Sequence, residues 1–113
     1  MGPDDLRALE AAGTESRIAA GRVLIEPGQR GSGLFVILEG TVVVEAPEGT
    51  REFGPGSVVG ERALFSLEGI RTARVRAIEN VRVVADDRVD VERLCAGDPD
   101  FAERLAAATE LPG

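Results

Sequence analysis

Apolar and polar positions alternate in short blocks along this chain, and the blocks predict strands in the middle and helices at both ends. Residues 3–12 place Leu6 and Leu9 on one helical face, and Gly13 follows as the end of that helix. Further along, period-two alternation and short apolar runs predict strands at residues 16–20, 22–26, 34–38, 41–46, 51–53, 57–59, 71–78 and 81–85.

One predicted strand differs from the rest in its pattern. Residues 34–38 are apolar at both odd and even positions, which is typical of a strand covered on both faces. Gly40 then separates this strand from residues 41–46, and we expect the two to form a hairpin. Strands this short and closely spaced favour a jelly roll or a small barrel.

The last third of the chain reads as two helices. Asp86 or Asp87 is a suitable cap for the first, and Asp98 with the following proline suits the start of the second. In the second helix Phe101 and Leu105 share one stripe, which we interpret as core rather than as a dimer interface. The predicted fold class is mainly β with flanking helices: a jelly-roll or double-stranded β-helix barrel with a short N-terminal helix and two C-terminal helices.

Length and charge narrow the classes of function. We expect residues 1–113 to form a single domain with one modest core. The net charge of −7, from 20 acidic residues against 13 arginines and no lysine, should repel nucleic acid and anionic membranes. The start of the chain has no hydrophobic stretch, so a cytoplasmic location is expected. With one cysteine, Cys95, and no histidine, neither a disulfide nor a metal site is expected, and Cys95 is interpreted as a core thiol.

Opposite charges flank one glycine-containing loop. Glu61 follows Gly60, and Arg71 begins the predicted strand of residues 71–78. On such a strand Arg71 shares the face of Ala73, Val75 and Ala77, which is the apolar face. An inward guanidinium needs a partner, because an unpaired buried charge costs several kcal/mol. The partner is either Glu61 or an anion from outside.

These residues resemble a known motif. Gly-Glu-Arg-Ala-Leu at residues 60–64, followed by Arg-Thr-Ala-Arg-Val-Arg-Ala at residues 71–77, is similar to the phosphate-binding cassette of cyclic nucleotide-binding domains, with the spacing of the bacterial catabolite-activator type. The similarity extends over nearly the whole chain. It implies a jelly-roll fold and a regulatory domain that is not an enzyme, with cAMP or cGMP as its ligand and no other cofactor.

The chemistry of the ligand suits these residue types. A planar guanidinium at Arg71 can donate to two phosphate oxygens at once, and a carboxylate at Glu61 can accept from the ribose 2′-hydroxyl. Backbone N–H groups at the start of a short helix after Glu61 would add donors to the phosphate, and Thr72 has a hydroxyl to offer phosphate or base. The candidate ligand-binding residues are Gly60, Glu61, Arg62, Ala63, Arg71 and Thr72.

The chain departs from the family pattern at Arg62, where an apolar residue is usual. This second cation strengthens phosphate binding, or pairs with Glu61 in place of ligand, or is a solvated arginine on an exposed turn. The pattern does not discriminate adenine from guanine.

Three functions are compatible with this sequence. The first is a cyclic-nucleotide sensor that signals through its C-terminal helices to an effector protein in trans or to a second copy of the chain. The second is a ligand-free interaction module in which Arg62 and Arg71 pair with Glu61. The third is a sensor domain excised from a larger regulator or transporter. A cupin-like enzyme is disfavoured because the histidines that hold its metal are missing, and no helix-turn-helix follows Leu111 to read DNA directly.

Overall fold

A computed structural model gives the fold, and it describes residues 2–28, 33–60 and 73–110. In chain order the elements of these residues are α1 (Pro3–Ala12), β1 (Thr14–Ile18), β2 (Val23–Ile25), β3 (Leu34–Glu39), β4 (Val42–Ala46), β5 (Gly49–Phe53), β6 (Val58–Val59), β7 (Arg74–Ala77), β8 (Val81–Asp86), α2 (Arg88–Gly97) and α3 (Phe101–Glu110). Each of the elements predicted from the hydrophobic pattern is present, with ends that shift by a few residues; the start of the strand predicted at residues 71–78 lies outside the described residues.

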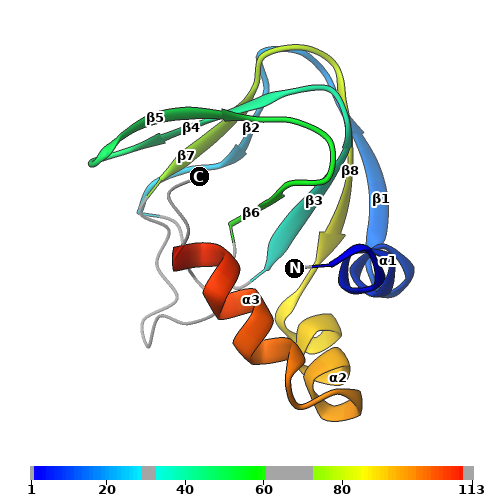
Figure 1. The fold of residues 1–113 in the computed structure, drawn as a ribbon. Helices are drawn as coiled ribbons and strands as arrows, with labels where there is room; N and C mark the ends of the chain where they lie inside the picture. The colour runs from blue at the N-terminus through cyan, green and yellow to red at the C-terminus, as the bar shows by residue number, and fades with distance from the viewer. Residues whose placement is uncertain (1, 29–32, 61–72, 111–113) are drawn as a thin grey trace.

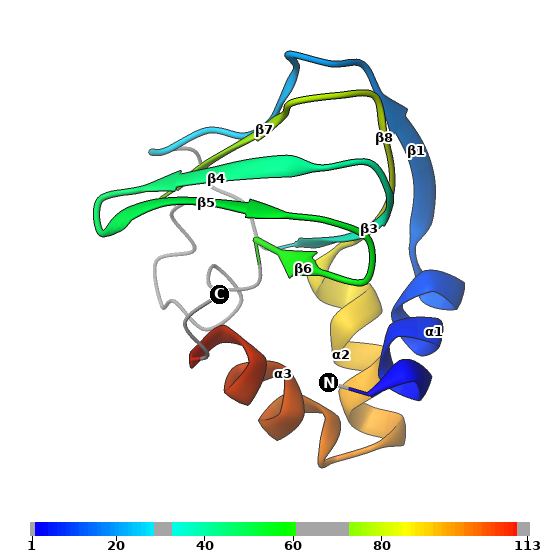
Figure 2. The ribbon, with the colours of Figure 1, turned by 45° about the horizontal axis from the view of Figure 1, so that its top comes forward.

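The strands form two antiparallel sheets of four strands each. Sheet A has the order β1-β8-β3-β6 and sheet B the order β2-β7-β4-β5. The two sheets lie against each other as the walls of a flattened barrel, and the three helices gather at the end of the molecule formed by sheet A (Figures 1 and 2). The predicted class, a jelly roll with one N-terminal and two C-terminal helices, is confirmed.

The expected hairpin at Gly40 is wrong. β3 pairs with β8 and β6 in sheet A, whereas β4 pairs with β7 and β5 in sheet B. Gly40 therefore turns the chain from one sheet into the other, with a left-handed φ of 84°. The physical reason is that β7 and β8 bend at the same place, so that β3–β4 and β7–β8 run as one long antiparallel ribbon folded across both sheets.

This bend is a crowded corner held by two hydrogen bonds. The N–H of Ile78 donates to the carbonyl of Thr41 at 3.1 Å, and the side-chain oxygen of Asn80 accepts from the N–H of Ala20 at 3.0 Å. A Cβ at Gly40 would lie 2.5 Å from the carbonyl oxygen of Asn80. Only glycine allows the backbone of residue 40 to come this close to the backbone of Asn80. The crowding at this corner, and not the needs of an isolated turn, therefore explains the glycine.

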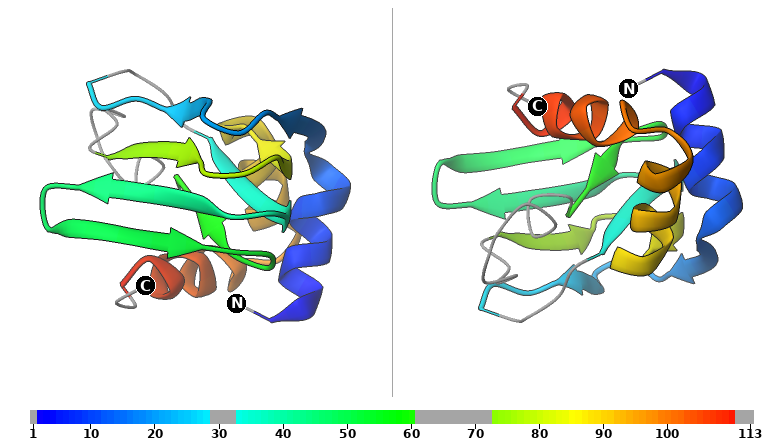
Figure 3. Two further views of the ribbon diagram at one scale, coloured as in Figure 1. Left: turned by 90° about the horizontal axis from the view of Figure 1, so that it is seen from above. Right: turned by 90° about the horizontal axis from the view of Figure 1, so that it is seen from below.

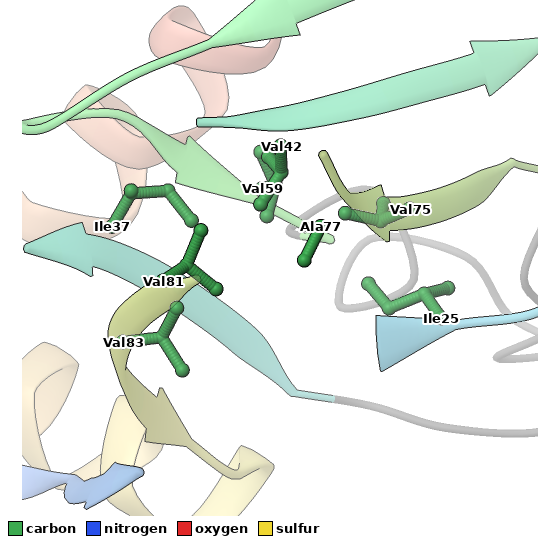
Figure 4. Close-up of a cluster of buried hydrophobic side chains, with 8 residues drawn as sticks. All are labelled: Ile25, Ile37, Val42, Val59, Val75, Ala77, Val81 and Val83. Atoms are coloured by element: carbon green, nitrogen blue, oxygen red, sulfur yellow. The ribbon is translucent and has the colours of Figure 1, made fainter. Parts of the chain in front are cut away.

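Alternate side chains of sheet A enter two different cores. The inner core lies between the sheets, where its side chains point toward one another (Figure 4). It consists of Ile25, Ile37, Val42, Val59, Val75, Ala77, Val81 and Val83. The outer core lies between sheet A and the helices and consists of Leu9, Leu34, Val36, Val84, Val91, Phe101 and Leu105. The prediction that residues 34–38 are covered on both faces is confirmed.

The helices dock on the outer core with the residues that the sequence indicated. Asp87, not Asp86, caps α2, because its side chain accepts from the N–H of Asp90 at 2.9 Å. Phe101 and Leu105 are 2% and 1% exposed, which confirms their placement in the core. Cys95 packs against the same cluster, and burial raises the pKa of its thiol.

One arginine joins the two ends of the chain. Arg104 of α3 donates from Nε and from one terminal nitrogen to the two carboxylate oxygens of Asp5 in α1, at 2.9 and 2.8 Å. The same terminal nitrogen donates to Asp98 at 2.6 Å. Asp5 is only 9% exposed, and its hydrogen bonds from Arg104 hold the pKa of that carboxyl below its ordinary value. This bidentate pair fixes α3 against α1.

We therefore expect Arg104→Met, which keeps the apolar stem and removes the charge, to lower the free energy of unfolding by about 1–2 kcal/mol at pH 7, a value discounted because Arg104 is partly exposed. The loss should begin to shrink as the pH falls below about 3.8, where the unfolded chain takes up a proton at Asp5, and should vanish once Asp5 is protonated in the folded protein as well. Chemical denaturation at pH 7 and at a pH below 4 measures both effects. Arg7→Met, which breaks the exposed pair with Asp4, is the control and should cost about 0.5 kcal/mol or less. Equal losses in the two variants would contradict the assignment.

Candidate ligand-binding site

Gly60 is the one candidate site residue that lies among the described residues. Glu61, Arg62, Ala63, Arg71 and Thr72 lie outside them, so their contacts stay predictions. What the structure does give is the position of the two strands between which residues 61–72 run.

Those two strands belong to different sheets. Val59 at the end of β6 pairs with Phe35 in sheet A, and Arg74 at the start of β7 pairs with Glu45 in sheet B. Residues 61–72 therefore connect the two walls of the barrel. Gly60 begins this connection with φ of 85°, in the left-handed region that favours glycine.

Both ends of the connection are anchored in the inner core. Val59 is 4% exposed and Val75 is 2% exposed, and the side chain of Val75 lies close to that of Ile25 in Figure 4. These contacts fix the directions in which the chain leaves β6 and enters β7. A ligand held by residues 61–72 would thus be held by a segment with two rigid supports.

The predicted parity of the second strand holds where the structure describes it. Val75 and Ala77 are buried, and the side chain of Arg74 is 45% exposed on the other face. The strand itself begins at Arg74, and the inward placement expected for Arg71 lies outside the described residues. That placement remains a prediction.

The outward arginines of β7 already have carboxylate partners. Arg74 donates to Glu26, which raises the pKa of that arginine, and Arg76 contacts Glu45 at 3.4 Å. Exposed pairs of this kind contribute little to stability. They do balance the cations of β7. Within residues 61–72, Arg62 and Arg71 are the predicted source of positive charge for an anionic ligand.

Sequence reasoning missed an ion pair between the terminal helices and a buried carboxyl group. The Asp5–Arg104 pair joins residues 99 positions apart, and no local pattern indicates it. Asp86 was considered only as a helix cap, but it is 1% exposed at the end of β8. The sequence did contain a signal for this burial. Asp86 has the same parity as Val84, so an extended strand places both side chains on the face that packs against the helices.

The described ranges contain neither a metal-binding cluster nor a membrane-spanning helix. Residues 2–28, 33–60 and 73–110 contain no group of three or more histidine, cysteine, aspartate or glutamate residues arranged to bind a metal ion. None of the helices within these ranges is long and apolar enough to cross a membrane.

The fold is shared with solved bacterial structures. A chain from a structure of a cyclic-GMP-dependent signalling pathway that regulates bacterial phytopathogenesis superposes with a TM-score of 0.87 and 26% identity, covering 96% of this chain and 90% of that one. Thermus thermophilus catabolite activator protein gives 0.77 and 26%, covering 95% and 53%. A cyclic nucleotide-binding-like protein from Brucella abortus gives 0.66 and 29%, covering 85% and 86%. These likenesses define the class: a jelly-roll domain of the kind found in bacterial cyclic-nucleotide signalling.

The sequence comparison identifies the family itself. The family described as cyclic nucleotide-binding domain matches residues 15–98, a stretch that includes all eight strands except the first residue of β1 and also includes residues 60–77. The chain belongs to the cyclic nucleotide-binding domain family. It is 35% identical over 103 residues to a cyclic nucleotide-gated potassium channel of Mesorhizobium japonicum, and 35% identical over 88 residues to one of Rhizobium etli. It covers 28% and 24% of these two relatives, about a quarter of their length.

Gly60 offers a test of how the site segment is set. Gly60→Ala forces a side chain into the left-handed region, so we expect it to lower the free energy of unfolding by about 1–2 kcal/mol. Thermal or urea unfolding followed by circular dichroism measures the change. Gly54→Ala is the matched control: its Cβ would meet no atom within 4 Å and its φ is not left-handed, so it should be neutral or stabilising by up to about 1 kcal/mol. Equal stability of the Gly60 variant and the wild type would mean that this φ is not required.

Proposed function

We propose that this chain is a regulatory domain that binds a cyclic nucleotide, cAMP or cGMP, through residues 60–72. The observation that carries the proposal is the coincidence of two features. The family match spans the strands on both sides of this segment, and the segment itself contains a carboxylate, small residues and an arginine in the order of a phosphate-binding cassette.

In this proposal Arg71 binds the cyclic phosphate. One guanidinium can donate two parallel hydrogen bonds to phosphate oxygens, and such charge-assisted bonds are about twice as strong as neutral ones. Backbone N–H groups of Arg62 and Ala63 add donors. Because the paired arginines of β7 are occupied by Glu26 and Glu45, the phosphate charge is met within the segment itself.

Glu61 is proposed to accept a hydrogen bond from the ribose 2′-hydroxyl. A deoxyribose would leave that carboxylate without its partner in a desolvated site, which makes the interaction selective. Thr72 supplies a hydroxyl to the phosphate or the base, and Gly60 sets the backbone at the start of the segment.

The ligand signal is proposed to reach the C-terminal helices through β6. Val58 packs against the outer core that contains Phe101 and Leu105, and it lies two residues before Gly60. A segment that closes on a ligand pulls on β6 and so on the surface where α3 is docked. α3 runs along the side of sheet A where β6 lies (Figure 3). In this proposal residues 60–72 and α3 have two arrangements, one favoured without ligand and one favoured with it. The ligand changes their populations only by the difference in its affinity for the two arrangements.

The partner of the domain belongs to the same proposal. An effector protein, attached or in trans, or a second copy of the chain would read the position of α3. The relatives named cyclic nucleotide-gated potassium channels make an ion-channel gate one class of effector. The family is regulatory in character, and we propose no catalytic step for this domain and a cytoplasmic location.

The test is a thermal-shift series with cAMP, cGMP and 5′-AMP. A ligand at about 100 times its dissociation constant should add about 2.7 kcal/mol to the free energy of unfolding. One cyclic nucleotide should therefore raise the melting temperature, and 5′-AMP, which carries a different phosphate, should do so less. Absence of a shift with every nucleotide at millimolar concentration would leave the ligand-free module as the function.

Arg71→Ala should weaken binding of the active nucleotide by about 1.5–3 kcal/mol, since it removes charged hydrogen bonds to phosphate. Isothermal titration calorimetry measures the affinity. Arg93→Ala, an exposed arginine of α2, is the control and should bind like the wild type. If both variants keep the wild-type affinity, Arg71 does not contact the phosphate.

A further inference from the structure

Asp86 is a buried carboxyl group with no partner among the residues that the structure describes. It is the last residue of β8 and 1% exposed, and neither of its side-chain oxygens has a hydrogen-bond partner there. Buried polar groups are nearly always paired, and a buried carboxylate is far more costly than a buried carboxylic acid. An orphan of this kind calls for an explanation.

Its surroundings are backbone and hydrocarbon. In the sheet it lies opposite Leu34 of β3, and from the helical side Gly13 comes so close that a Cβ there would lie 2.6 Å from one carboxyl oxygen of Asp86. Gly33 approaches the main chain of the same residue, since its Cβ would lie 2.7 Å from the carbonyl oxygen. The carboxyl group is therefore wedged between the end of α1, the end of β8 and the start of β3.

Within the part of the chain that the structure describes, the charges that act on Asp86 are negative. They belong to Asp90 in the first turn of α2 and to its cap, Asp87. α1 has no basic residue in its last turn, and β3 presents Leu34. Burial first, and then these two carboxylates, raise the pKa of Asp86 to about 7.

We propose that Asp86 is a proton-binding site at the junction of sheet A with α1 and α2, and that loss of its proton loosens the docking of these helices. The proposal does not depend on the nucleotide. In this proposal the docking of the helical layer, which also contains α3, depends on the protonation of Asp86 in addition to any effect of the nucleotide. A negative charge created in this wedge has no cation to pair with among residues 2–28, 33–60 and 73–110 and is repelled by the carboxylates of Asp87 and Asp90, so the structure relieves it by moving the helices away from the sheet.

The sign of the pH dependence follows from the raised pKa. The folded protein holds a proton on Asp86 at pH values where the unfolded chain, with a carboxyl of ordinary pKa near 3.8, has lost it. Stability therefore falls as the pH rises from about 4 to about 7, and the loss is complete above about 7. Asp5 and Glu39, whose pKa values are lowered, change stability in the opposite sense and only at more acid pH.

The first test compares melting temperatures at pH 5 and pH 8 for the wild type and Asp86→Asn. Between pH 5 and pH 8 the melting temperature of the wild type should fall by on the order of 10 °C more than that of the variant. The melting temperature of a small domain changes by about 4–8 °C for each kcal/mol of unfolding free energy. Glu92→Gln removes an exposed carboxylate from α2 and is the matched control; it should follow the wild type. A wild type and an Asp86→Asn variant with the same pH profile would overturn the proposal.

The second test needs no variant and decides the matter if Asp86→Asn does not fold. The carboxyl carbon of Asp86 in the ¹³C-labelled wild type should titrate near neutral pH, and a midpoint near 4 would overturn the proposal. Hydrogen exchange, corrected for intrinsic rates, then locates the change: between pH 6 and pH 8 the amides of α1 and α2 should lose protection while those of the β4–β5 hairpin keep it. An equal loss in all elements would show that no specific helix docking depends on Asp86.

Discussion

The structure depends on sheet A being buried on both faces. Val36 and Ile37 are adjacent in β3 and both 0% exposed, and Val83 and Val84 of β8 are 0% and 3% exposed. One residue of each pair points between the sheets and the other toward the helices. Because a strand presents its side chains alternately to its two faces, a shift of register by one residue would exchange the two cores. The barrel and the helical layer are thus fixed by the same strands and cannot be set independently.

The long folded ribbon carries this constraint to the candidate site. β3–β4 and β7–β8 bend together at Gly40 and Asn80, so that β6 ends in sheet A while β7 begins in sheet B. Residues 61–72 must cross between them. The position of the candidate segment therefore follows from the topology, and the segment is joined at one end to β6, whose Val58 packs on the same core as α3.

Sequence patterning was informative where burial alone determines structure. The two-faced strand at residues 34–38, the inward parity of Val75 and Ala77, and the core position of Phe101 all follow from apolar periodicity, and the structure confirms them. The hairpin at Gly40 was wrong because a glycine turn looks the same whether the chain returns in its own sheet or passes to another, and only the pairing with β7 and β8 decides. The Asp5–Arg104 pair has no local signature either. In the candidate site, Gly60 has a left-handed backbone, for which glycine is suited, whereas Glu61 and Arg71 lie outside the described residues and their roles stay predictions.

The central claim is that a cyclic nucleotide binds between the end of β6 and the start of β7. Its most direct measurement is an NMR titration of the ¹⁵N-labelled chain with cAMP and with cGMP. The account predicts saturable shifts at the amides of residues 59–75, smaller ones in α3, and almost none in the β4–β5 turn. Unchanged spectra at millimolar nucleotide, or shifts centred away from residues 59–75, would contradict it.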